Sequence, residues 1–155
     1  MSANAAVRLT PEGWRKLHDE LIQLRDRREA ALTAQLQARQ GATTEEVSEA
    51  ASTSEVDYLT HSISEMEWVL SRAEPVADEE REPGVIGVGA EVRVVWDDGD
   101  QETLIIVGPP EVSAREGRIS YESPVGQALM GRRAGEQVWV ATQAGLSRLE
   151  IDQVQ

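Results

Sequence analysis

The chain has 155 residues, no cysteine and a formal net charge of -13 at pH 7. This length allows one domain of ordinary size or two small ones, and 40% apolar residues are typical of a globular protein. The missing cysteines exclude disulfides and thiolate metal ligands, and the acidic charge argues against a protein that binds duplex DNA through a basic face.

A long helix is predicted near the start of the chain, in the stretch LTPEGWRKLHDELIQLRDRREAALTAQLQAR. Its apolar residues alternate steps of three and four, which is the spacing of a coiled-coil seam: Trp14, Leu17, Leu21 and Leu24. Thr10 fits the N-cap position, and Pro11 fits the first helical position. Taken over roughly 27 residues at about 1.5 Å each, this helix is on the order of 40 Å long.

A second helix with its own seam is predicted after Gly41. Its apolar positions step by four and three: Leu59, Ile63, Met66, Leu70 and Ala73. Thr43, followed three residues later by Glu46, fits a capping box that opens this helix. Because each helix has one apolar stripe and only a short segment joins them, we expect an antiparallel hairpin shaped as a rod, with its tip at residues 41–46.

Negative charge gathers on the second half of this hairpin. Residues 40 to 71 carry seven acids and no lysine or arginine. Glu45 and Glu46 lie in the first turn of the second predicted helix, where the helix dipole favours carboxylates, so helix capping alone accounts for them. Glu49, Glu55 and Asp57 lie beyond that turn beside other negative charges, so a helix terminus explains them less well.

A linker and a small α+β domain are predicted after the hairpin. Proline and glycine end the helical pattern from Pro75 onward, and the apolar pattern then has period two. Five short antiparallel strands and one short helix, with Gly131 as its stop, fit this part of the chain. The predicted core comprises nine residues: Val92, Val94, Trp96, Ile105, Val107, Val138, Val140, Leu149 and Ile151.

Two motifs stand out in this sequence, LTPEGWRKLHDELIQL near the start and ISYESPVGQALMGRRAGEQVWV near the end. They resemble the two signatures of the bacterial Gre family of transcript cleavage factors, GreA and GreB. In the second motif seven residues fall at the family's spacing: Ser123, Pro124, Gly126, Leu129, Gly131, Gly135 and Val138. The resemblance runs from about Arg8 to Gln155. It implies an antiparallel coiled-coil domain over residues 8–74, a linker over 75–85 and an FKBP-like domain over 86–155.

The resemblance also implies a partner, bacterial RNA polymerase. The segment matching Glu122, Ser123 and Pro124 would dock at the rim of the polymerase's secondary channel, and the coiled coil would enter the channel. The protein would have no cofactor and no active site of its own, and would act on the polymerase's active site. We further expect the protein to lie in the cytoplasm, because no membrane span and no signal peptide are visible. We also expect it to be a monomer that makes no direct contact with duplex DNA.

One departure from the family pattern concerns catalysis. In active members an Asp directly after the tip glycine and a Glu three positions later help hold a second Mg²⁺ at the polymerase's active site. Here these positions are Ala42 and Glu45. Mg²⁺ requires oxygen ligands at about 2.0–2.1 Å, and alanine offers none. Glu46 is turned about 100° away along the helix and Glu49 lies a turn further on, so neither is placed to replace the missing carboxylate.

Three hypotheses follow from these observations. The first is a Gre-like regulator that occupies the secondary channel and modulates or inhibits transcription, with cleavage stimulation lost or reduced. The second is an elongation factor that still stimulates cleavage of backtracked RNA through a rearranged acidic tip, with Glu45 contacting the polymerase's Mg²⁺. The third is an interaction module whose coiled coil pairs with an unrelated helix. Ala42 separates the first two, and the segment ESPVGQALMG separates both from the third.

Overall fold

A computed structural model of the chain describes residues 6–41 and 53–155. The chain forms two compact units: the described residues before Arg15 group with those after Arg72, and the described residues of Arg15–Arg72 form the other unit. The domain boundaries predicted from the sequence stay a prediction, because compactness alone does not define them. None of the helices in the described ranges combines the length and the hydropathy needed to cross a membrane.

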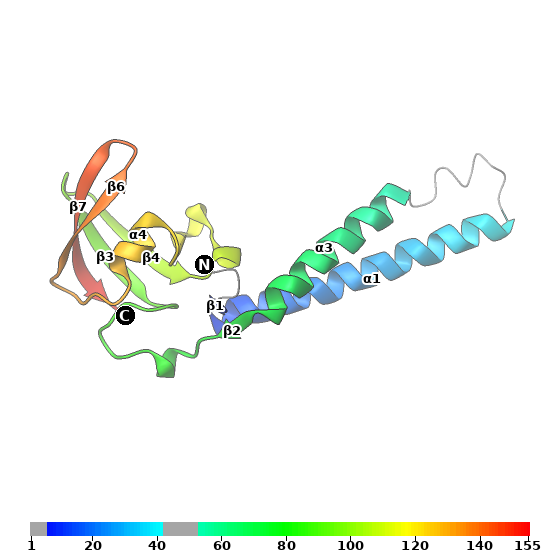
Figure 1. Cartoon of the computed structure of the whole chain (residues 1–155), viewed down its shortest axis with the longest axis horizontal. Helices are drawn as coiled ribbons and strands as arrows, with labels where there is room; N and C mark the ends of the chain where they lie inside the picture. The colour runs from blue at the N-terminus through cyan, green and yellow to red at the C-terminus, as the bar shows by residue number, and fades with distance from the viewer. Residues whose placement is uncertain (1–5, 42–52) are drawn as a thin grey trace. The chain divides into compact units, whose positions relative to one another are not determined.

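The helical unit is built from two helices that run side by side (Figure 1). Helix α1 spans Pro11–Gly41 and helix α3 spans Thr53–Ser71. Of the predicted seam residues, Leu21, Leu59 and Ile63 are buried, and Ala31 is buried as well. The other predicted seam residues of the two helices are half-buried: Trp14, Leu17, Leu24, Met66 and Leu70. Arg25 Nη2 lies 2.5 Å from Glu67 Oε1 and links the two helices at the surface. The capping box predicted for Thr43 and Glu46 lies outside the described residues.

The base of the hairpin differs from the prediction. Helix α3 ends at Ser71, so Ala73 does not close the helical seam but opens strand β2 (Ala73–Pro75). This strand pairs in parallel with strand β1 (Val7–Leu9), in the register Val7↔Ala73 to Leu9↔Pro75. Proline disfavours helical geometry in the residue before it, so the chain extends ahead of Pro75 and finds its hydrogen-bond partners in β1.

A five-stranded sheet forms the centre of the other unit. Its strands are β3 (Glu91–Trp96), β4 (Gln101–Val107), β5 (Arg118–Ser120), β6 (Gln137–Thr142) and β7 (Gly145–Val154). Their order in the sheet is β5-β4-β3-β7-β6. The prediction of five strands is confirmed, but β5 pairs with β4 in parallel. Two 3₁₀ turns, at Pro109–Glu111 and Ala114–Glu116, bring the chain back to the same end of the sheet and cause this exception.

The core lies on one face of this sheet, beneath helix α4 (Pro124–Leu129). Seven of the nine predicted core residues are buried, whereas Ile105 and Trp96 are half-buried. Leu104 and Ile106 occupy the inward positions on β4 instead. The run from Leu104 to Val107 is apolar throughout, so a period-two pattern does not reveal which residues face inward.

Candidate functional site

The predicted docking segment lies at the start of helix α4, where Ser123 is the N-cap. Its Oγ accepts a hydrogen bond from the backbone N–H of Gly126 at 3.1 Å and donates one to the backbone oxygen of Ser120 at 2.6 Å. Pro124 occupies the first helical position, where its missing N–H costs nothing. A side chain at Gly126 would place its Cβ 1.9 Å from the same Ser120 oxygen. Helix α4 is therefore seated tightly on the end of β5.

The backbone of Glu122 is fixed on both sides. Its N–H donates to Ser120 Oγ at 3.0 Å, and its carbonyl accepts from Gln127 Nε2 at 3.0 Å. The residue is nevertheless exposed, as is Pro124, whereas Ser123 is half-buried. The segment thus presents two surface residues on a rigid backbone, and Ser123 holds that backbone rather than facing outward.

This difference in role predicts different effects of two substitutions on stability. Ser123→Ala removes the N-cap and should lower the free energy of unfolding by about 0.5–2 kcal/mol. Glu122→Ala should leave it nearly unchanged, because only backbone atoms of Glu122 make the contacts described above. Urea denaturation of both variants checks this expectation. Equal losses in the two variants would contradict the assignment of Ser123 as the structural member of the segment.

The acidic tip predicted from the sequence is not covered by the structure. Ala42, Glu45, Glu46 and Glu49 all lie outside the described residues. On the described part of α3, the acids Glu55, Asp57, Glu65 and Glu67 are exposed. The hairpin therefore carries negative charge on its surface along α3, as the sequence indicated.

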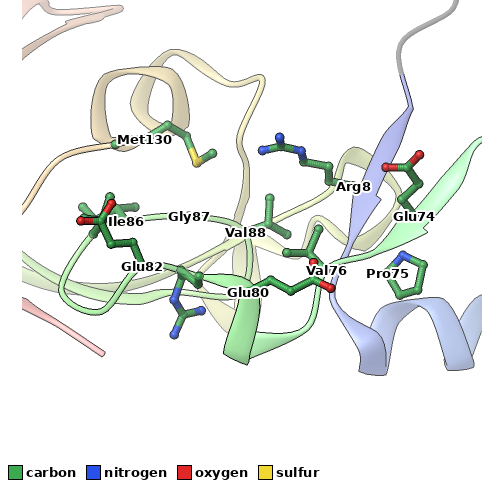
Figure 2. Close-up of a pocket in the computed structure, with 13 residues that line it drawn as sticks. Arg8, Glu74, Pro75, Val76, Glu80, Glu82, Ile86, Gly87, Val88 and Met130 are labelled. Carbon is green, nitrogen blue, oxygen red and sulfur yellow. The ribbon is translucent and has the colours of Figure 1, made fainter.

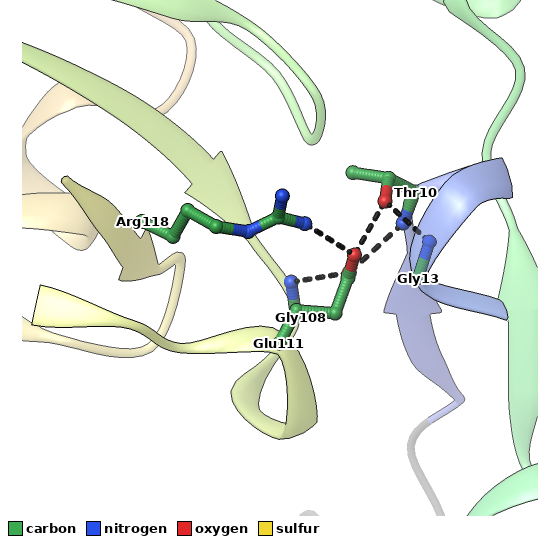
Figure 3. Close-up of polar contacts among 5 residues, drawn as sticks. All are labelled: Thr10, Gly13, Gly108, Glu111 and Arg118. Atoms are coloured by element: carbon green, nitrogen blue, oxygen red, sulfur yellow. Dashed lines mark hydrogen bonds and ion pairs between the residues drawn. The ribbon is translucent and has the colours of Figure 1, made fainter. Parts of the chain in front are cut away.

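A buried carboxylate joins the first turn of α1 to the sheet (Figure 3). Glu111, with a side chain only 3% exposed, accepts hydrogen bonds from the Thr10 N–H at 2.9 Å, the Gly108 N–H at 3.2 Å and Arg118 Nη2 at 3.1 Å. The Thr10 hydroxyl also donates to Glu111 and accepts from the Gly13 N–H at 3.0 Å. Thr10 is therefore the predicted N-cap of α1, and Glu111 orients it.

Sequence reasoning missed Glu111 and Arg118. Glu111 follows two prolines and lies in a stretch without periodicity, so the residues around it do not mark it as buried. Gly13 was a weak indication of this contact. It lies in a helix, and a Cβ at this position would overlap the Glu111 carboxylate. Glycine in a helix interior is unfavourable and usually has a packing reason.

GreA of Thermodesulfovibrio yellowstonii is 34% identical over 148 residues, and the match covers 94% of each chain. This chain belongs to the GreA/GreB family of transcription elongation factors. A family model described as "Transcription elongation factor, GreA/GreB, C-term" matches residues 80–155. The match to GreA of Chloroflexus aurantiacus is 46% identical over 90 residues, and the chain spans 57% of that relative's length.

Among solved structures, that of Thermus aquaticus Gfh1 is 29% identical to this GreA/GreB family member, with 99% of each chain covered and a TM-score of 0.44. Family membership confirms the resemblance found in the two sequence motifs. The predicted fold class is also confirmed, with a helical hairpin and an antiparallel-rich sheet that carries one short helix.

Proposed function

We propose that this GreA/GreB family member binds RNA polymerase at the rim of its secondary channel and acts on the polymerase's active site. The observation that supports docking is the segment at the start of α4, where a fixed backbone presents Glu122 and Pro124 to solvent. Rigid exposed groups bind at a low cost in conformational entropy, because little ordering remains to be done on association. We propose that the protein acts as a single chain in the cytoplasm and makes no contact with duplex DNA.

The second part of the proposal concerns the hairpin. Two paired helices with exposed acids form an element suited to a narrow, positively charged channel. The proposed outcome is modulation or inhibition of transcription, with cleavage stimulation lost or reduced. Ala42 supports this outcome, because one of the two carboxylates of active family members is missing there. A single Glu45 supplies fewer oxygen ligands to Mg²⁺ than a pair of carboxylates.

One alternative keeps the same partner. Glu45 is retained at its family position, and Glu46 and Glu49 follow it. In that case the protein would be an elongation factor that stimulates cleavage of backtracked RNA. A transcript cleavage assay on stalled elongation complexes distinguishes the two, since efficient cleavage by the unmodified protein would remove the inhibitor proposal.

The docking proposal predicts that replacing both Glu122 and Pro124 by alanine weakens binding to core RNA polymerase roughly tenfold or more, while the fold is kept. Both residues are exposed, and Ser123 stays in place as the cap. A matched control replaces Pro110 and Glu116, which are also exposed and lie in 3₁₀ turns of the same unit. Equal affinity of the two double variants in a pull-down titration would show that the docking segment lies elsewhere.

Salt provides another test of the proposed interface. An acidic hairpin that approaches a positively charged channel loses long-range attraction as screening shortens to about 8 Å at physiological ionic strength. We therefore expect the affinity for core polymerase to fall several-fold between about 0.05 and 0.5 M salt, measured by fluorescence anisotropy. Affinity that is independent of salt would indicate a mainly apolar interface and would contradict charge-guided insertion.

A further inference from the structure

Helix α3 carries an open hollow of about 630 Å³ on its surface. Five residues of the helix line it: His61, Ser64, Glu65, Trp68 and Val69. It differs from the hollow of about 430 Å³ in the sheet-containing unit, whose walls come from separate segments of the chain around Arg8, Glu74 and Met130 (Figure 2). A hollow formed by one helix gains an opposite wall only when another polypeptide lies alongside it.

The hollow belongs to a second stripe of side chains along α3. Tyr58, His61, Glu65 and Trp68 step by three, four and three, so they share one face of the helix. At about 100° per residue, this outer stripe lies about 150° around the helix from the seam that faces α1. Tyr58 is 65% exposed and Trp68 is 55% exposed. Helix α3 is therefore patterned for two helical neighbours, and α1 supplies one of them.

Contacts within the chain orient the side chains of the outer stripe. The guanidinium carbon of Arg72 lies 4.4 Å from the centre of the Trp68 ring, in a cation–π contact. His61 Nε2 lies 3.4 Å from Glu65 Oε1, and the two side chains are 74% and 70% exposed. The stripe thus presents an aromatic ring at each end and an imidazole beside a carboxylate in the middle.

The order of these side chains is self-complementary. Tyr58 and Trp68 lie five positions on either side of Ile63, and His61 and Glu65 lie two positions on either side. When two copies of α3 pair antiparallel about this point, Tyr58 of each meets Trp68 of the other, and His61 of each meets Glu65 of the other. A two-fold axis requires such reciprocal contacts. A parallel pair would instead place Glu65 against Glu65, and like charges repel.

We infer that the outer stripe of α3 is a self-association surface, on which a second copy of this chain pairs antiparallel. The aromatic rings at the two ends would lose exposed apolar surface, which favours pairing. The exposed contacts between His61 and Glu65 would add little affinity but would fix the register. Four side chains form a small interface, so the pairing is reversible and no tighter than the micromolar range.

This pairing has a consequence for the proposed function. Two hairpins joined through α3 are wider than one, so the single chain is the form suited to a narrow channel. The pair is then a reserve form, and polymerase draws on the single chains. This consequence rests on the proposed function, whereas the pairing itself does not.

The first test compares two exposed tryptophans by analytical ultracentrifugation over a concentration series. Trp68→Ala should weaken self-association of the full chain about tenfold or more, because it removes an aromatic ring from both ends of the interface. Trp139→Ala removes a ring that is 65% exposed in the sheet-containing unit and should weaken self-association less than about twofold. Equal association of the two variants would overturn the inference.

The second test checks the antiparallel register with two charge variants. His61→Glu places two carboxylates opposite each other in a pair, and Glu65→Lys places a lysine opposite an imidazole, so each variant alone should associate several-fold more weakly. When the two variants are mixed, the introduced glutamate meets the introduced lysine, and association should recover. The mixture contains the same two folded chains as the separate samples, so a loss of folding does not imitate the result. A mixture that associates no better than its components would overturn the register.

Binding to core RNA polymerase separates this inference from the proposed function. The unmodified chain pairing without binding polymerase would overturn the proposed function and leave the pairing in place. A chain that stays monomeric at millimolar concentration would overturn the pairing alone. Trp68→Ala should bind polymerase at least as tightly as the unmodified chain, because none of it is held in pairs. Weaker binding by Trp68→Ala, together with no pairing of the unmodified chain, would overturn the inference and assign the outer stripe to polymerase.

Discussion

Replacing Glu111 by alanine is expected to lower the free energy of unfolding of the sheet-containing unit by about 3–5 kcal/mol. The substitution removes the acceptor for the N–H groups of Thr10 and Gly108, and it leaves Arg118, whose side chain is 14% exposed, without its ion-pair partner. A cation left alone in a buried site keeps its full desolvation cost. Urea denaturation followed by tryptophan fluorescence measures the effect, since Trp14, Trp96 and Trp139 belong to this unit.

Two comparisons make this prediction specific. Glu116→Ala removes an exposed carboxylate from the next 3₁₀ turn and should change the free energy of unfolding by less than about 0.5 kcal/mol. Adding Arg118→Met to Glu111→Ala should recover part of the loss, because it removes the unpaired cation but not the unsatisfied N–H groups. A loss for Glu111→Ala no larger than for Glu116→Ala would show that the buried carboxylate does not stabilise this unit.

The second large effect concerns catalysis at the tip. If Ala42 is the reason for weak cleavage, Ala42→Asp should restore a carboxylate pair with Glu45 and raise the rate of cleavage of backtracked RNA roughly tenfold or more. Asp is favoured just before a helix N-terminus, so the substitution should be tolerated. The measurement is transcript cleavage in stalled elongation complexes, and Glu45→Ala should abolish whatever activity remains.

Inhibition of RNA synthesis gives an independent readout at the same tip. Removing Glu45, Glu46 and Glu49 together should weaken inhibition, because the negative charge that competes for or perturbs the polymerase's metal is lost. Inhibition that survives the triple substitution would mean that the hairpin acts by blocking the channel. An unchanged cleavage rate in Ala42→Asp would contradict the assignment of Ala42 as the defect.

The sequence predicted the main elements because their patterns are local. Steps of three and four identified the seam that contains Leu21 and Ile63, and alternation located the strands around Val94 and Val140. The N-cap of α1 was also readable, since Thr10 contacts an N–H group only three residues away. Each of these features depends on residues that are close together in the chain.

What the sequence did not reveal depends on distant partners. Ala73 continues the helical spacing but pairs with Val7 in a sheet. Strand β5 has only three residues, which is too few to show from the sequence that it pairs with β4 in parallel. The burial of Glu111 requires Thr10, which is 101 residues away. The tip, the docking assignment and the domain boundaries stay predictions, because they derive from the family resemblance rather than from contacts in the structure.

The pairing of β1 with β2 bears on the order in which the protein folds during its synthesis. The two helices contact each other through residues made before Ser71, so the hairpin can form early. Strand β1 has no partner until Pro75 has been made, and Thr10 meets Glu111 later still. Contacts between distant residues form slowly, because a long loop must close first. The two helices can therefore pair first, whereas the pairing of β1 with β2 and the contact between Thr10 and Glu111, both within the sheet-containing unit, form later.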